Sequence, residues 1–146
     1  VREFLERAEN IPSEAWYPAV PRQRLEARFP GNRRTYVRFR EGTFTGGNLL
    51  MLAPGVWERG IGQAEKLIAM RKRPLRLAAM IGFDFVLRLV LGRATIPEAE
   101  RRFSRLLGMT VRAVVSSHPE VGVDIDHPSD IPYCEHELTL RQGGAG

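Results

Sequence analysis

The chain has 146 residues, of which 43% are hydrophobic and 27% are charged. This composition excludes an intrinsically disordered chain and suits a single domain that buries a hydrophobic core. The apolar stretch from residue 77 to residue 91 is interrupted by Asp84 and Arg88, so we expect no membrane-spanning segment. Cys134 is the single cysteine and the start shows no signal-peptide pattern, so we expect no internal disulfide and a cytoplasmic location.

The formal net charge is +5, which raises the question of nucleic-acid binding. Most arginines alternate with acidic residues or lie on predicted amphipathic helices. The sequence has no helix-turn-helix, zinc-ligand set or aromatic RNA-stacking motif. Nucleic-acid binding is therefore the less favoured interpretation, because basic residues around a nucleotide or a phosphorylated substrate account for the charge equally well.

Apolar periodicity, with breaks at glycine and proline, predicts alternating helices and strands. The predicted helices cover residues 2–9, 23–29, 56–71, 74–90 and 95–107, and Gly108 closes the last of them. The predicted strands cover residues 15–20, 34–40, 43–45, 49–52, 111–116 and 121–125. A turn at Glu41 and Gly42 makes a hairpin of residues 34–45. Trp16 and Trp57 are expected to be core residues.

The continuous apolar run Leu49–Leu52 is typical of a strand buried on both faces, and we place the parallel part of the sheet there. Because helices connect the strands, the sequence predicts an α/β fold with a layered, mixed, mostly parallel sheet flanked by helices and a projecting β-hairpin. We treat residues 1–146 as a single domain. The glycine-rich end, within residues 137–146, is expected to be a flexible tail.

Gly46, Gly47 and Asn48, which we call the Gly-Gly-Asn turn, stand where the hairpin meets this apolar run. Glycines let a ligand approach the backbone because they lack a Cβ, and Asn48 adds a hydrogen-bond donor and an acceptor. The pattern therefore indicates a substrate-binding turn. The alternative that it leaves open is a β-bulge with no ligand.

Asp124 and Asp126 alternate with Val123 and Ile125 in a short predicted strand, which places both carboxylates on one side. Adjacent carboxylates repel each other unless a cation lies between them, and such oxygen ligands suit Mg²⁺. Open α/β sheets bind ligands at the carboxyl ends of their strands, which favours a metal site. The alternative is an edge strand with a polar face. Asp130 fits a helix-capping acid instead.

Three segments, in this order, resemble one protein family: residues 42–49, which contain the Gly-Gly-Asn turn, residues 71–78, and residues 122–130. They are similar to the C-terminal half of nucleotidyltransferases like molybdenum-cofactor guanylyltransferase, which belong to a glycosyltransferase-A-like superfamily. The resemblance covers roughly residues 15–131. It implies a partial Rossmann-like, glycosyltransferase-A-like nucleotidyltransferase fold.

The resemblance also implies an activity. Such enzymes depend on Mg²⁺, transfer a nucleotidyl group from an NTP to a small phosphorylated or cofactor-like acceptor, and release pyrophosphate. Asp126, supported by Asp124, would hold the metal, and the Gly-Gly-Asn turn would lie against the acceptor. We assign no catalytic residue. The family's glycine-rich nucleotide loop belongs upstream of Val1, so we expect this chain to be the acceptor-binding part of a longer domain and inactive alone.

Two other functions stay open. A non-catalytic α/β module that binds a partner or itself is favoured, for this fragment, by the lack of the nucleotide loop. A basic nucleic-acid-binding domain is the third hypothesis. If the chain is part of something longer, an edge or face of the sheet should expose apolar side chains, and we expect another copy of the chain to cover them.

Overall fold

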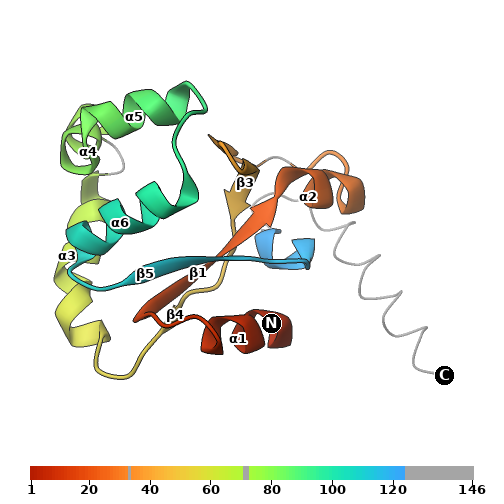
Figure 1. The fold of residues 1–146 in the computed structure, drawn as a ribbon, viewed down its shortest axis with the longest axis horizontal. Helices are drawn as coiled ribbons and strands as arrows, with labels where there is room; N and C mark the ends of the chain where they lie inside the picture. The colour runs from red at the N-terminus through yellow and green to blue at the C-terminus, as the bar shows by residue number, and fades with distance from the viewer. Residues whose placement is uncertain (33, 71–72, 124–146) are drawn as a thin grey trace.

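The computed structural model describes residues 1–32, 34–70 and 73–123. This part of the chain forms three layers, with a five-stranded mixed sheet between two groups of helices (Figure 1). The expected layered α/β class is confirmed. The metal candidates Asp124 and Asp126 and the C-terminal tail lie outside the described residues.

Strand β1 (Ala15–Pro21) is the centre of the sheet. Along one edge it pairs with β3 (Gly42–Gly46) and, nearer its own start, with β4 (Met51–Leu52). Along the other edge it pairs with β5 (Val111–Val115). Strand β2 (Val37–Phe39) extends the sheet by pairing with β3, so the predicted hairpin is present and is joined to the sheet.

The direction of the pairings follows from the connections between the strands. The pairings β1–β3, β1–β4 and β2–β3 are antiparallel, and β1–β5 is parallel. Antiparallel pairings thus predominate among the described strands, although the sequence predicted a mostly parallel sheet. The parallel pairing lies at β5 and not at residues 49–52, where it was predicted. A two-residue turn at Arg40 and Glu41 forces β3 to reverse after β2. The chain between β1 and β5 is long and contains helices, as two parallel neighbouring strands require.

Helices α1 (Arg2–Glu9) and α2 (Arg22–Arg28) cover one face of the sheet (Figure 1). Trp16 and Val20 alternate with Tyr17 and Ala19 along β1, so they point to this face. The buried residues of this layer form two clusters, which consist of Phe4, Ala8, Trp16 and Val114 and of Val20, Leu25 and Phe29.

Four helices lie on the other face: α3 (Trp57–Met70), α4 (Pro74–Ile81), α5 (Phe83–Val90) and α6 (Ile96–Leu107). Helix α6 begins with a capping box and ends at Gly108 in the left-handed conformation, so the prediction that Gly108 closes this helix is confirmed. Within the described ranges, no helix has the length and apolar character needed to cross a membrane.

The predicted helix of residues 74–90 is bent into two at Gly82, which has a φ of 106°. Arg102 of α6 holds this corner, because its guanidinium donates to the Ile81 carbonyl (2.8 Å) and pairs with Asp84. A Cβ at residue 82 would overlap with the same guanidinium. Desolvation alone would raise the pKa of Asp84, but the hydrogen bond and charge of Arg102 lower it.

The outer edge of β5 is covered by side chains. The Val111 and Ala113 amides donate to the Ser104 hydroxyl and to the Glu100 carboxylate, each at 2.9 Å. Arg7 donates to the carbonyl of the last β5 residue (2.8 Å). These groups occupy positions that an added strand would use. Association of two copies through this edge would have to displace them, and the expected oligomer stays a prediction.

Three further predictions from the sequence are wrong. The run 49–52 is not buried on both faces, because only its last two residues pair with β1 and Leu50 is 60% exposed. Trp57 is 57% exposed at the start of α3 instead of lying in the core. Residues 119–122 form a 3₁₀ helix, η1 (Pro119–Gly122), where a strand from residue 121 was predicted. A proline is well suited to the first turn of a helix.

Glu14 ties the start of β1 to two other elements. Its carboxylate accepts the Thr110 amide (2.8 Å) and pairs with Arg59 of α3 (2.7 Å). The hydrogen bond from Thr110, followed by that from Arg59, lowers the pKa of Glu14 below its ordinary value of 4.5. A carboxyl whose pKa is lowered on folding adds stability above its unfolded pKa and loses that contribution as the pH falls through its folded pKa.

We therefore expect Glu14→Gln to unfold at a lower urea concentration than the unchanged chain at neutral pH. The difference between the two midpoints should shrink as the pH falls below 4.5, because the carboxyl becomes protonated first in the unfolded chain and then, below its lowered pKa, in the folded chain as well. Circular dichroism during urea unfolding measures both midpoints. Glu9→Gln, on the exposed side of α1, is the matched control and should shift the midpoint little. A Glu14→Gln difference that does not depend on pH would contradict this account.

Candidate functional site

The Gly-Gly-Asn turn lies in a break between β3 and β4. Ala19 pairs with Gly46, and Ala15 pairs with Leu52. The two pairs are four positions apart along β1 but six positions apart along the segment that contains β3 and β4. The two additional residues leave the ladder as a bulge. The bulge that the sequence left open is therefore present, and it places Asn48 on the surface.

Both glycines of the turn lie in close contact with other parts of the protein. The Gly47 amide donates to the Pro18 carbonyl (2.9 Å). A Cβ at residue 47 would lie 2.6 Å from the Pro18 Cγ and 2.9 Å from the Val121 carbonyl oxygen. A Cβ at Gly46 would overlap with the hydroxyl of Tyr17, which lies directly over this backbone. The glycine pair therefore lets other parts of the chain approach.

Asn48 joins the turn to the segment that precedes the predicted metal ligands. Its amide donates to the Val121 carbonyl (2.8 Å), and its side-chain Nδ2 donates to the Val123 carbonyl (2.8 Å). Val123 directly precedes Asp124 in the sequence. The structure thus places the Gly-Gly-Asn turn beside Val123, while Asp124 and Asp126 lie outside the described residues.

A polar cavity of about 440 Å³ opens at the turn. Besides the turn itself, its walls come from Tyr17, Arg34, Thr35 and Thr45. Arg34 donates to the Gly46 carbonyl (3.0 Å) and lies 3.5 Å from the Asn48 Oδ1. Sequence reasoning missed Arg34 and Tyr17, because a single arginine or tyrosine carries no spacing signal; only the antiparallel register brings them beside the turn.

The residues that the structure describes contain no group of three histidine, cysteine or acidic side chains that could hold a metal ion. On the far side of Asn48, a groove of about 600 Å³ carries Glu3, His118 and Glu120. Desolvation opposes ionisation of Glu3, but the hydrogen bonds from Ser117 lower its pKa. The Glu3 carboxylate is thus used by Ser117 and by Arg7 within the fold.

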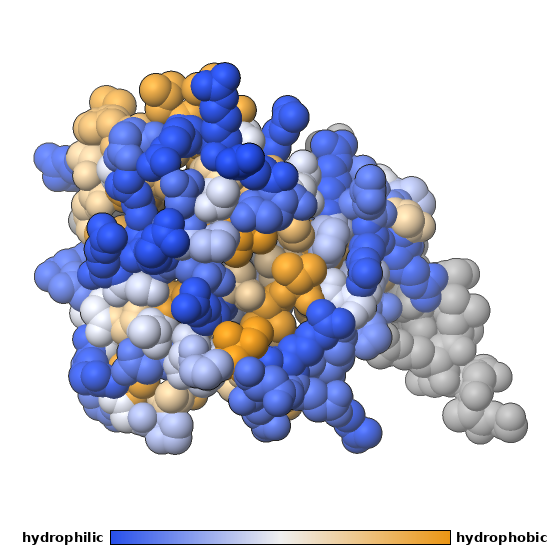
Figure 2. Space-filling model, viewed as in Figure 1, coloured by the Kyte–Doolittle hydropathy of each residue, from blue (hydrophilic) through white to orange (hydrophobic). Residues whose placement is uncertain are grey.

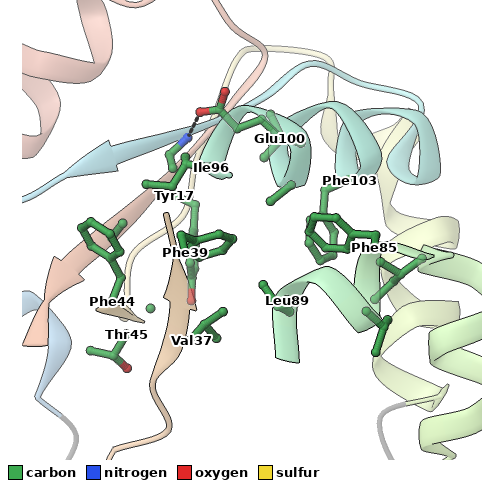
Figure 3. Close-up of a pocket in the computed structure, with 17 residues that line it drawn as sticks. Tyr17, Val37, Phe39, Phe44, Thr45, Phe85, Leu89, Ile96, Glu100 and Phe103 are labelled. Carbon is green, nitrogen blue, oxygen red and sulfur yellow. Dashed lines mark hydrogen bonds between the residues drawn. The ribbon is translucent and has the colours of Figure 1, made fainter. Parts of the chain in front are cut away.

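A second cavity, of about 320 Å³, lies between the sheet and helices α4–α6 (Figure 3). Aromatic rings from separate elements line it: Phe39 and Phe44 from the hairpin, and Phe85 and Phe103 from α5 and α6. Tyr17, Thr45 and Gly46 line both this apolar cavity and the polar one. The two cavities therefore adjoin at the start of the Gly-Gly-Asn turn.

Glu100 is the single carboxylate among the residues that line the apolar cavity. Its carboxylate accepts the Ala113 amide (2.9 Å), drawn as a dashed line in Figure 3, and pairs with Arg112 (2.6 Å). Both carboxylate oxygens are thus engaged with the protein. The cavity offers a ligand aromatic and aliphatic surface rather than a charge.

No family model and no curated protein matches the chain. A solved structure described as a hypothetical transferase from Thermus thermophilus is 45% identical and superposes with a TM-score of 0.82. The match covers 90% of this chain and 58% of that one, so this chain spans somewhat more than half the length of that protein. The two share their fold over most of this chain.

We expect Gly47→Ala to lower the free energy of unfolding by about 1–3 kcal/mol, the usual cost of overpacking a close contact. The new Cβ meets the Pro18 ring and the Val121 carbonyl, neither of which can move without the backbone. Gly46→Ala should cost less, because only the end of the Tyr17 side chain has to move.

Urea unfolding measures these free energies. Gly62→Ala is the matched control, because a Cβ there meets no atom within 4 Å and alanine favours the surrounding helix α3. Equal stability of the Gly47→Ala and Gly62→Ala chains would show that the turn is not packed as described.

Proposed function

We propose that this chain is the acceptor-binding part of a Mg²⁺-dependent nucleotidyltransferase, which transfers a nucleotidyl group from an NTP to a small phosphorylated or cofactor-like acceptor. A transferase, the more general assignment, is supported by the 45% identity with the hypothetical transferase of Thermus thermophilus. One observation supports the finer assignment: the Asn48 side chain binds the carbonyl of Val123, directly before the Asp124–Asp126 segment.

This hydrogen bond joins segments that are 75 residues apart in the sequence. One of them is the predicted acceptor contact, and the other leads into the predicted metal ligands. Asp126 is the stronger candidate ligand and Asp124 the supporting one. Carboxylate oxygens are the ligands that Mg²⁺ prefers, and the bound ion would neutralise charge on the triphosphate.

The polar cavity suits a phosphorylated acceptor. Arg34 supplies a guanidinium at its wall, and guanidinium groups bind phosphate through paired N–H donors. The neighbouring Asn48 adds a polar side chain to the same wall, and Thr35 adds a hydroxyl. We propose that these groups position the acceptor, and that positioning supplies much of the rate enhancement.

In the proposed reaction an oxygen of the acceptor attacks the α-phosphorus of the NTP. The new phosphorus–oxygen bond forms as the bond to the bridging oxygen of the β-phosphate breaks, and pyrophosphate leaves. This chain spans 58% of the related transferase, so we propose that residues outside it supply the nucleotide-binding loop. We expect this chain alone to bind NTP weakly or not at all.

In the intact protein, Asp126→Asn should remove most NTP-dependent pyrophosphate release, because it removes a charged metal ligand. The loss of folding stability should be small, since carboxylates that share a metal site repel each other when the metal is absent. Asp130→Asn, an equal change in charge at a predicted helix-capping acid, is the matched control and should retain turnover. Pyrophosphate release at several Mg²⁺ concentrations measures both variants. Retained activity of Asp126→Asn with a normal Mg²⁺ dependence would refute the metal assignment.

One observation favours the alternative, a non-catalytic module that binds itself. Phe83, Leu87 and Val90 are exposed on α5, and Figure 2 shows apolar side chains gathered over this helix at the top of the view. If this face binds a second copy, the mass measured by light scattering should rise with concentration, and Leu87→Lys should prevent the rise. A strictly monomeric chain at high concentration would exclude this alternative.

A further inference from the structure

We propose that the apolar cavity holds an uncharged alkyl or aromatic group of the acceptor, whose phosphate lies at the Gly-Gly-Asn turn. The acceptor is then an amphiphile: a phosphate that carries an apolar group. That this ligand is the acceptor of the reaction rests on the proposed function. Whether the cavity binds such a ligand can be tested without turnover.

The first support is the size and the chemistry of the cavity. Protein interiors are close-packed, and voids larger than a water molecule are few. This cavity of about 320 Å³ has roughly twice the volume of an engineered cavity of about 150 Å³ that stays dry and binds benzene. Side chains such as Phe39, Phe85, Leu89 and Phe103 surround the space (Figure 3). Such walls favour an apolar ligand over water.

The second support is that the cavity is held open. Helix α5 forms one wall of the cavity, and its start is held by Arg102, which binds the Ile81 carbonyl and Asp84. The hairpin wall is fixed at its tip, where the Arg40 amide donates to the Ala94 carbonyl (2.9 Å) and the Glu41 carboxylate accepts the Ile96 amide (3.2 Å). Helix α5 and the hairpin are thus each tied by polar contacts to α6 or to the residues just before it, and these contacts oppose collapse of the cavity.

The third support is continuity with the polar cavity. Tyr17 stands between the two, since its side chain lines both and its hydroxyl lies over Gly46. The same tyrosine is 42% exposed, so the boundary is reached from solvent. A ligand with its apolar group on the Phe44 side would place a phosphate on the Arg34 side. Glu100 does not oppose this, because its carboxylate is engaged by Ala113 and Arg112.

Calorimetry with inorganic phosphate, ethyl phosphate and hexyl phosphate tests the inference on the full chain without NTP or Mg²⁺. Each methylene that enters the cavity should tighten binding roughly fourfold. Ala99→Leu fills the cavity from α6 and should remove most of the preference for hexyl phosphate. The matched control Ala27→Leu, on the exposed side of α2, should retain it. If Ala99→Leu does not fold, Ala113→Val fills the space from β5.

Equal affinity for hexyl phosphate and inorganic phosphate would overturn the inference. It would also be overturned if a folded Ala99→Leu or Ala113→Val chain kept the whole preference for hexyl phosphate. Neither result bears on the metal site. Suppose instead that the filling variant removes the preference for longer alkyl chains and that the intact protein releases no pyrophosphate from an NTP. This pair of results would overturn the proposed nucleotidyl transfer and leave the cavity as a site for apolar phosphates.

Discussion

The contact between the Gly47 backbone and β1 is the constraint on which the candidate site depends. The Gly47 amide binds the Pro18 carbonyl, and the next amide, that of Asn48, binds the Val121 carbonyl of η1. A residue with a side chain at position 47 would push both neighbours away. The bulge, the central strand and η1 therefore take their relative positions from one glycine. The polar cavity and the position of Val123 depend on that arrangement.

Strand β1 separates a filled layer from a hollow one. On one face, Trp16 and Val20 are packed under α1 and α2. On the other, small Ala19 and half-exposed Tyr17 leave a space that the rings of Phe39 and Phe44 do not fill. An unfilled cavity lowers stability, because its lining atoms lose contacts. A cavity that lowers the stability of the fold is typical of a binding site, because side chains that filled it would exclude the ligand.

Local signals predicted much of the fold, and non-local contacts account for the rest. The capping box and Gly108 of α6 are complete within a few residues, so the sequence predicts that helix closely. The exposure of Leu50 could not be predicted, because it depends on a bulge that appears only when β3 and β4 pair with the same strand. The Gly-Gly-Asn turn can be recognised from its residue types alone. Arg34 cannot, because only the pairing of the strands brings it beside the turn.

Two adjoining cavities of opposite character constrain what the site can select. A hydrophobic cavity alone discriminates weakly, by roughly 1 kcal/mol for each methylene added or removed. A polar site that would leave buried donors unpaired discriminates more strongly. The Tyr17 side chain lies at the junction, so a ligand that satisfies only one cavity leaves the other filled with water or empty. Selectivity would then come from the distance between the apolar group and the phosphate of the ligand, which the β1–β3 register sets, rather than from either cavity alone.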